Sequence, residues 1–316
     1  MSLSHSEVIN RFVNKGATKG KGANMFIEGD VLYDYGHHFP MLVRTDFGLL
    51  LNADKYSSTT SHHQSMCMEY AKIQIPFSVL RAANLIKSYG FDKPTFELIK
   101  ADKQRWDLTG KWSRWVKDGS RHGKTETISN KEYLALDANT RLTYSKQTER
   151  RPEASIIKQG DKYYLSSMDG WNYFMCLLPE PATTIKDAFA SLKPKEVGKK
   201  FVRQGEWFFV EATELPIVLM KDGIADFGRA IKTVYKAMTQ KFELPKKRPE
   251  SNSHIATRGM QVESAIYVSG QVRHVTHFGG RGEHRMLVLS KSDKPKIFRA
   301  YENRAIESYS ASGRVD

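Results

Sequence analysis

The fold is decided by the stretch MFIEGDVLYDYG (residues 25–36) and its continuation PMLVRTDFGLLLNAD (residues 40–54). Both consist of short extended runs broken by turn residues, at Gly29 in the first stretch and at Gly48 in the second. Alternation of apolar and polar residues between such turns is typical of strands joined by hairpins. The two stretches therefore predict an antiparallel meander.

Hairpin and helix signals continue along the chain. Gly160 and Gly205 mark further tight turns, and Thr184 is placed to cap a helix. Helical spacing of apolar residues predicts three helices, over residues 79–89, 185–193 and 226–242. The sequence thus predicts an α+β protein built mainly from antiparallel sheet with several helices, as one body or as two lobes.

Composition divides the chain into three expected parts. Residues 1–24 begin with a short expected helix around residues 8–13 and then contain KGATKGKG, a lysine-glycine run that cannot bury a face, so we expect a flexible basic N-terminal arm there. Residues 25–150 are expected to form a β-rich lobe with a basic, tryptophan-containing segment. Residues 151–316 are expected to form an α+β lobe with a C-terminal hairpin, and PKKRPE at residues 245–250 is expected to be a hinge between lobes.

Composition also limits the class of protein. The 316 residues are 40% hydrophobic and 27% charged, as in ordinary globular proteins, and carry a formal net charge of +14. The two cysteines, Cys67 and Cys176, lie in apolar runs far apart in the sequence, which favours buried, reduced thiols. No signal peptide or membrane span is indicated. We therefore expect a cytoplasmic protein without a membrane partner.

The positive charge is concentrated in KADKQRWDLTGKWSRWVKDGSRHGK, residues 100–124. This segment holds eight Lys or Arg residues against three Asp residues, and three of the five tryptophans, Trp106, Trp112 and Trp115. Cations displace counterions from phosphates, while indole rings stack on bases. The pattern indicates nucleic acid as the partner, with the tryptophans stacking or wedging between bases and at least one of them belonging to the core.

The cations expected to bind phosphates belong to this segment and to the polar side of the 226–242 helix. They are Lys100, Lys103, Arg105, Lys111, Arg114, Lys117, Arg121, Lys124, Arg229, Lys232 and Lys236. A charged stripe on a helix is also consistent with simple solvation, and a basic charge balance with solubility alone.

A candidate catalytic site lies in QVRHVTHFGGRGEHRMLVL, residues 271–289. A hairpin closed at its Gly-Gly-Arg-Gly turn would place His277 opposite His284, with their Cβ atoms about 4.5–5.5 Å apart. Two facing imidazoles beside Arg273 and Arg281 suit proton transfer at a phosphate better than metal binding, because nearby cations repel a metal ion. The alternative interpretation is a pair of surface histidines in an ordinary hairpin.

Other motifs indicate no specific chemistry. His274-x-Thr matches one element of the two-histidine phosphoesterases, but His254-x-x-Thr is one residue out of register for the second. Adjacent histidines in GHHFP and TTSHHQS point in different directions, so we predict no metal site. The hydroxyl-rich turn before the second pair is expected to place a helix that is capped by Thr60 or Ser61. No nucleotide-binding or hydrolase signature occurs, which leaves any cofactor unknown.

Four motifs resemble a scattered set of uncharacterised proteins from phages, plasmids and related mobile elements: GHHFPMLVR, TTSHHQS, RQGEWFF and ENRAIESYSASGRVD. The resemblance covers most of the chain, but it implies no activity and no catalytic residues. It implies a setting in which basic cytoplasmic proteins commonly handle DNA or RNA.

Three functions are left open by the sequence. The first is binding of nucleic acid through the arm, the tryptophan-rich segment and the basic helix. The second is phosphoester processing of the nuclease or phosphodiesterase type, using His277 and His284. The third is a structural or inhibitory role through a protein partner, in which the charge is incidental. Whether the protein is an enzyme is therefore undecided.

Overall fold

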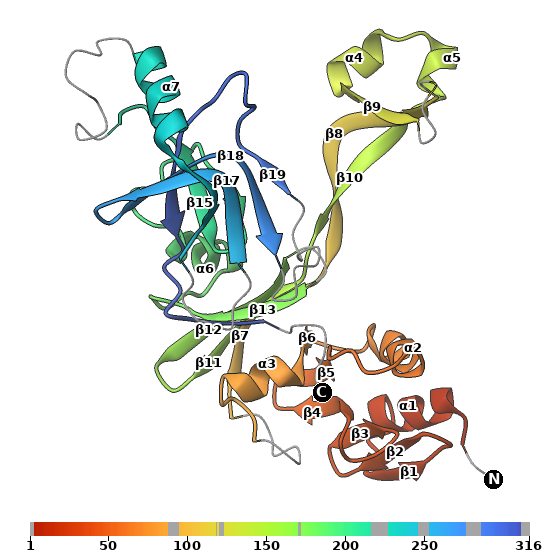
Figure 1. Cartoon of the computed structure of the whole chain (residues 1–316). Helices are drawn as coiled ribbons and strands as arrows, with labels where there is room; N and C mark the ends of the chain where they lie inside the picture. The colour runs from red at the N-terminus through yellow and green to blue at the C-terminus, as the bar shows by residue number, and fades with distance from the viewer. Residues whose placement is uncertain are drawn as a thin grey trace. The chain divides into compact units, whose positions relative to one another are not determined.

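The chain forms a sheet-dominated α+β protein, as predicted, in a computed structural model that describes residues 3–87, 95–117, 119, 123–169, 172–215, 227–245, 253–275 and 286–310. The chain divides into two units (Figure 1). Their boundaries differ from those expected at residues 24 and 150. Unit 1 comprises residues 1–100 and 155–316, and unit 2 comprises residues 101–154.

Unit 1 begins with a six-stranded sheet whose strands follow one another in chain order. They are β1 (Lys19–Lys21), β2 (Met25–Glu28), β3 (Val31–Asp34), β4 (Pro40–Thr45), β5 (Gly48–Asn52) and β6 (Ile73–Ile75). The meander predicted over residues 25–54 is confirmed, and only β6 joins its neighbour in parallel. Gly29 and Gly48 stand in its turns at φ +59° and φ +117°, a backbone conformation that favours glycine.

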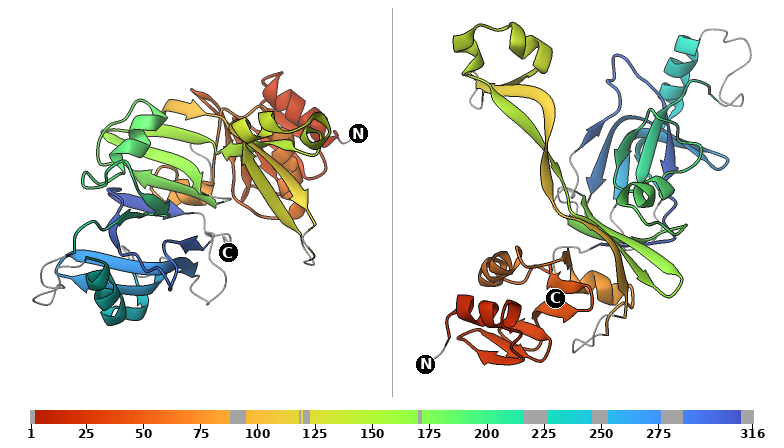
Figure 2. Two further views of the ribbon diagram at one scale, coloured as in Figure 1. Left: turned by 90° about the horizontal axis from the view of Figure 1, so that it is seen from above. Right: turned by 180° about the vertical axis from the view of Figure 1, so that it is seen from behind.

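Residues 1–24 differ from the flexible arm that we expected. Helix α1 (His5–Val13) packs its buried Val8, Ile9 and Phe12 into the core of the N-terminal sheet (Figure 2). The lysine-glycine run forms β1, which pairs with β2. The run has no apolar face of its own, but backbone pairing to a neighbouring strand and the apolar face of α1 supply the order that its composition alone does not predict.

Helices α2 and α3 both depart from their expected bounds. Helix α2 (Ser58–Cys67) is capped by Ser57, whose hydroxyl accepts a hydrogen bond from the Thr60 backbone N–H at 3.0 Å, so it begins earlier than predicted. Helix α3 (Phe77–Ala82) is shorter than the predicted 79–89 helix. Asn84 adopts a left-handed conformation at φ +57°, which ends the helical path.

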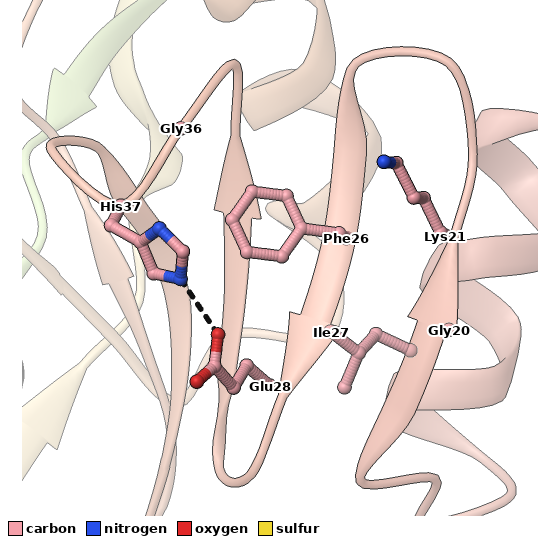
Figure 3. Close-up of a pocket in the computed structure, with 7 residues that line it drawn as sticks. All are labelled: Gly20, Lys21, Phe26, Ile27, Glu28, Gly36 and His37. Atoms are coloured by element: carbon pink, nitrogen blue, oxygen red, sulfur yellow. Dashed lines mark hydrogen bonds and ion pairs between the residues drawn. The ribbon is translucent and has the colours of Figure 1, made fainter.

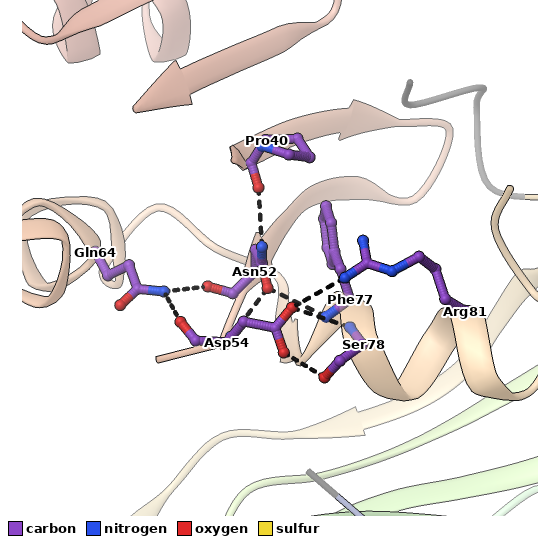
Figure 4. Close-up of polar contacts among 7 residues, drawn as sticks. All are labelled: Pro40, Asn52, Asp54, Gln64, Phe77, Ser78 and Arg81. Carbon is purple, nitrogen blue, oxygen red and sulfur yellow. Dashed lines mark hydrogen bonds and ion pairs between the residues drawn. The ribbon is translucent and has the colours of Figure 1, made fainter. Parts of the chain in front are cut away.

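A buried polar network joins β5 to α3 (Figure 4). The Asn52 side-chain oxygen accepts hydrogen bonds from the backbone N–H groups of Asp54 (2.9 Å) and Phe77 (3.1 Å). The Asp54 carboxylate accepts from the backbone N–H (2.9 Å) and the hydroxyl of Ser78, and lies 3.7 Å from the Arg81 guanidinium. Because buried polar groups are costly unless they are bonded, this network fixes the chain path beyond β5.

The second sheet of unit 1 has the order β21-β13-β12-β11-β7. Its strands are β7 (Glu97–Asp102), β11 (Ala154–Gln159), β12 (Lys162–Asp169), β13 (Asn172–Leu177) and β21 (Glu307–Ser310). The turn predicted at Gly160 joins β11 to β12. Helix α6 (Ile185–Ser191) begins at the predicted cap, where the Thr184 hydroxyl accepts from the Asp187 N–H at 3.1 Å.

The third sheet has the order β14-β15-β20-β18-β17-β16, with β19 also paired to β18. Its strands are β14 (Val202–Gln204), β15 (Trp207–Glu211), β16 (Thr239–Glu243), β17 (Ser253–Val262), β18 (Ala265–Val275), β19 (Leu287–Val288) and β20 (Phe298–Glu302). The predicted turn at Gly205 joins β14 to β15. Trp207, Phe209 and Val268 lie in a common apolar core on one side of this sheet.

The predicted 226–242 helix is divided between two elements. Helix α7 (Phe227–Ala237) takes its first part, and β16 takes its last part by pairing with β17. The ring of Phe242 lies against Gly259, where a Cβ would come within 2.5 Å of it. The expected hinge at residues 245–250 connects β16 to β17, neighbours in one sheet, so it does not separate two lobes; residues 246–250 lie outside the described chain.

Unit 2 is a three-stranded antiparallel ribbon with two short helices, in the order β10-β8-β9. Its elements are β8 (Arg105–Val116), β9 (Lys124–Ser129), α4 (Asn130–Ala135), α5 (Ala138–Arg141) and β10 (Ser145–Arg151). Helices α4 and α5 lie together at one end of the ribbon (Figures 1 and 2). Among its described residues, only Tyr144 and Ala154 are buried, so unit 2 has almost no interior.

Unit 2 is an insertion between two neighbouring strands of unit 1. The chain leaves unit 1 after β7 and returns to it at β11, and these strands are adjacent in the second sheet. The Gln159 side-chain amide donates to the Thr95 hydroxyl at 2.6 Å, so the end of β11 lies beside the start of β7. The second sheet is therefore continuous across the point of insertion.

Both cysteines are buried, as predicted, Cys67 on α2 and Cys176 on β13. Burial, assisted by the charge of Asp34, raises the pKa of the Cys67 thiol to about 12. At neutral pH this side chain is a protonated packing residue and not a nucleophile. None of the helices in the described part of the chain is long and apolar enough to cross a membrane.

Candidate functional site

The three tryptophans of the basic segment all lie on β8, the central strand of unit 2. Trp106 and Trp115 are largely exposed, at 59% and 62% of their surface, whereas Trp112 is partly buried. Exposure of this size is unusual for an indole, because the ring is mostly apolar. Trp106 and Trp115 are therefore available for contact with a partner.

Trp112 has a structural role. Its ring stacks on Tyr133 with 3.5 Å between the centroids and 3° between the planes, and its indole N–H donates to the Asn130 side-chain oxygen at 3.0 Å. The Lys146 ammonium lies 5.6 Å from the same ring. These contacts hold α4 on the ribbon, although Trp112 is only partly buried.

Trp112 and Trp115 lie on opposite faces of the ribbon. Trp106 lies beyond a register shift between Lys146 and Thr148, which interrupts the regular alternation of β8 between Trp106 and Trp112. Trp112 and Trp115 are three residues apart in a regularly paired run of β8 and so point to opposite faces. The tryptophans thus do not form one continuous stacking surface.

Three described arginines of the ribbon form ion pairs. Arg105 and Arg151 lie 3.0 Å and 3.2 Å from the Asp107 carboxylate, and Arg114 lies 2.7 Å from Glu126. The hydrogen bond from Arg105, joined by that from Arg151, holds the pKa of Asp107 below its usual value. The hydrogen bond between Arg114 and Glu126 likewise raises the pKa of the guanidinium and lowers that of the carboxyl.

The lysines of the segment are exposed and uncommitted. Within the described residues none of them forms an ion pair with a carboxylate, and they are Lys100, Lys103, Lys111, Lys117 and Lys124. Lys100 lies on β7 of unit 1 and the others belong to unit 2. Arg121, also expected to bind phosphate, lies outside the described residues.

The basic side of α7 is exposed, as its spacing predicts. Arg229, Lys232 and Lys236 face solvent, while Ala230 and Val234 are buried in an apolar cluster of unit 1. This arrangement is equally typical of an ordinary surface helix. The role of these cations in binding stays a prediction.

The C-terminal candidate site is described in part. Arg273 is exposed on β18, but His277, Arg281 and His284 lie outside the described residues, so their pairing stays a prediction. The strands on either side are antiparallel, as expected. Leu287 pairs with Val272, however, which is offset by two residues from the register that places His277 opposite His284.

A different histidine pair is brought together by the third sheet. His254 on β17 and His274 on β18 are direct cross-strand partners with ring centroids 4.6 Å apart, and Glu206 Oε1 lies 3.4 Å from His254 Nδ1. Burial raises the pKa of Glu206, but the hydrogen bond from His254 and the charges of both histidines outweigh it, so that pKa is lowered overall. His254 is buried, while Glu206 and His274 are partly exposed.

This pair depends on a β-bulge that sequence reasoning missed. The register of β17 against β18 shifts by one residue at Thr257, and Gly270 occupies the bulge at φ +84°, where a Cβ would come within 2.8 Å of Thr257. The Thr257 hydroxyl accepts from the Gln271 N–H at 3.0 Å. Regular pairing would set His254 opposite Arg273. A glycine inside a strand pattern was the available signal.

A second buried histidine holds the N-terminal helices in place. His63 Nδ1 lies 2.9 Å from Asp34 Oδ1, with both side chains almost wholly buried, and the His5 ring contacts the His63 ring at 4.3 Å. These side chains connect α1, α2 and β3, in agreement with the structural role expected for the TTSHHQS turn. Among the described residues, no group of three or more His, Cys, Asp or Glu side chains is placed to hold a metal ion.

The chain was compared with protein-family models, with curated proteins and with solved structures. No family model, curated protein or solved structure matches it.

Proposed function

We propose that the protein binds nucleic acid through unit 2. The observation that carries the proposal is the exposure of Trp106 and Trp115, 59% and 62%, on a ribbon that also presents unpaired lysines. Unit 2 holds twelve Lys and Arg residues against eight Asp and Glu residues. A polyanion with flat apolar bases satisfies both features, since phosphates attract the cations and bases cover the rings.

The lysines are the proposed phosphate contacts. Arg105 and Arg114 already have carboxylate partners and would have to exchange them for phosphate. Lys103, Lys111, Lys117 and Lys124 have no such partner to give up among the described residues. Each lysine that binds a phosphate releases counterions and thereby steepens the dependence of affinity on salt.

The test is the slope of log affinity against log salt for a labelled oligonucleotide. A fourfold variant of unit 2 (K103A/K111A/K117A/K124A) should lower the slope by about three, at roughly 0.7–0.9 per lysine. The matched control removes the same charge from exposed lysines of unit 1 (K186A/K195A/K199A/K200A) and should leave the slope nearly unchanged. Equal losses in the two variants would show that only net charge matters, and the proposal would fail.

The exposed rings are tested separately. Trp106→Leu and Trp115→Leu should each weaken binding by about fivefold or more, the lower end of what one base–aromatic stack contributes. Leu108→Ala is the control, because Leu108 is 65% exposed on β8 but carries no ring. A loss from one variant alone would identify the ring that contacts the bases.

A second candidate function, phosphoester processing, is supported by the Glu206–His254–His274 cluster. Glu206 orients His254, and His274 brings a second, partly exposed imidazole to the same place, an arrangement suited to proton transfer. Under this proposal the wild-type protein cleaves an oligonucleotide and His274→Ala does not. The control is His62→Ala, an exposed histidine of α2. If His277→Ala and His284→Ala abolish cleavage and His274→Ala does not, the activity would belong to the His277/His284 pair expected from the sequence.

A further inference from the structure

The edge of the N-terminal sheet formed by β1 and β2 carries a hollow of about 520 Å³ (Figure 3). The alternate residues of β2, Met25 and Ile27, are buried in the core that includes α1, so Phe26 and Glu28 point the other way. Lys21 on β1 is the cross-strand partner of Phe26.

The floor of the hollow is aromatic. The Phe26 ring is partly exposed, lies 5.0 Å from the Tyr33 ring at 16° between planes, and meets the edge of the His37 ring at 4.9 Å. In Figure 3 the Phe26 ring stands between the Glu28–His37 pair and the Lys21 side chain. A flat ring held by flanking rings is a rigid platform for a second flat ring.

Polar groups of opposite character flank this platform. The Glu28 carboxylate lies 2.6 Å from His37 Nε2, with side chains that are 66% and 69% exposed. An exposed pair of this kind contributes little to the stability of the fold. A ligand that also binds the Glu28 carboxylate would therefore weaken the pair with His37 at little cost in free energy. Lys19 and Lys21 are exposed on the neighbouring edge strand and supply positive charge.

We propose that this hollow binds a nucleotide whose base carries the amino group of cytosine (N4) or adenine (N6), either free or as one unit of a single strand. The base stacks on Phe26, its amino group donates to the Glu28 carboxylate, and its phosphate lies at Lys21. A carboxylate accepts from the cytosine amino group but finds no donor at the same position of uracil. The site belongs to unit 1 and is independent of the ribbon.

The test is calorimetric titration of the full chain with cytidine and uridine 5′-monophosphates, in the unit 2 lysine variant K103A/K111A/K117A/K124A. That background removes the proposed phosphate contacts of the ribbon, and the Phe26 variants below separate this site from Trp106 and Trp115, so failure of this site and failure of the proposed function are distinguishable. Cytidine monophosphate should bind more tightly than uridine monophosphate. Glu28→Gln should reduce that preference. Lys21→Ala should weaken the binding of cytidine monophosphate and leave the affinity for cytidine, which has no phosphate, unchanged.

The ring has its own variants. Phe26→Leu should weaken the binding of cytidine monophosphate by about fivefold or more, whereas Phe26→Tyr, which keeps a ring, should retain the wild-type affinity. Phe201→Leu is the matched control, because Phe201 is a 40% exposed ring with a lysine, Lys193, 5.8 Å from its centroid. It should change nothing.

Three results would overturn the proposal. The first is absence of cytidine monophosphate binding, and the second is inorganic phosphate that binds the site as tightly as the nucleotide does. The third is an equal loss of nucleotide affinity in Phe26→Leu and Phe201→Leu. The source of the nucleotide is read from the dinucleotide CpC. Binding about tenfold tighter than the mononucleotide supports a unit of a strand, and equal binding supports a free nucleotide.

Discussion

The two units of this chain differ in how they place their large apolar side chains, which are mostly buried in unit 1 and mostly exposed in unit 2. In unit 1, large apolar side chains such as Phe12, Leu42 and Phe209 are fully buried. In unit 2, Trp106, Trp115 and other large apolar side chains are exposed, and among described residues only Tyr144 and Ala154 are buried. Burial in an interior therefore accounts for the large apolar side chains of unit 1 but not for those that unit 2 exposes.

The ion pairs differ in the same way. Asp34 and His63 in unit 1 are almost wholly buried, whereas Arg105 and Asp107 in unit 2 are 65% and 37% exposed. Buried pairs are expensive to break, while exposed pairs contribute little and are screened by salt. Side-chain changes should therefore affect stability strongly in unit 1 and affect contact with partners in unit 2.

The largest expected effect comes from truncating a buried ring. Phe12→Ala should lower the free energy of unfolding of unit 1 by about 3–5 kcal/mol, because it removes a fully buried ring that also lies under the Arg44 guanidinium. Trp106→Ala should stay within about 0.5 kcal/mol. Urea unfolding of both variants measures this contrast, and comparable losses would show that unit 2 has a core after all.

The next effect is the pH dependence that Cys67 brings to unit 1. Its raised pKa, about 12 against an ordinary 9.0, stabilises the fold fully below pH 9, and this contribution is lost as pH rises toward 12. Three pKa units at about 1.4 kcal/mol each give about 4 kcal/mol at most. The free energy of unfolding of Cys67→Ala should fall less steeply than that of the wild type between pH 9 and 12. An identical pH dependence in the two proteins would show that Cys67 is not the cause.

A smaller effect is expected inside unit 2. Trp112→Leu removes the stack on Tyr133 and should weaken the attachment of α4 by about 1 kcal/mol. Hydrogen exchange should accelerate in α4 and stay unchanged in the N-terminal sheet. Trp106→Leu serves as the control, and acceleration that spreads into unit 1 would mean that the two units unfold together.

The smallest effect concerns Asp107. At low salt its pKa should lie below the usual value, and Arg105→Gln should raise it only part of the way back, because Arg151 remains. A lowered carboxyl pKa stabilises the fold above the unfolded-state value, and that contribution is lost as pH falls through the folded-state value. Carboxyl NMR titration measures the shift, and added salt should diminish it. A pKa that responds to neither change contradicts the surface pairing.

Features that depend on local sequence could be predicted. The meander, the turns at Gly160 and Gly205, and the cap at Thr184 rest on turn and cap chemistry within a few residues, and all appear in the structure. The exposure of the 226–242 helix's cations likewise follows from spacing alone.

Features that depend on distant pairing could not be predicted. The end of the 226–242 segment becomes a strand because β17 lies beside it, and the lysine-glycine run becomes a strand because β2 does. The His254–His274 pair requires a one-residue shift at Gly270. The boundaries of unit 2 were missed because β8 and β10 pair across 31 or more intervening residues, a relation that no local pattern reports.

The position of unit 2 between two neighbouring strands has a consequence for how this protein can change over generations. Both crossing points lie at one place on the second sheet, so the DNA coding for the ribbon can be lengthened, exchanged or lost while β7 and β11 stay side by side. Selection can therefore alter the ribbon's surface without first repairing the scaffold. Descendants of one ancestor could share the three sheets of unit 1 and carry different ribbons.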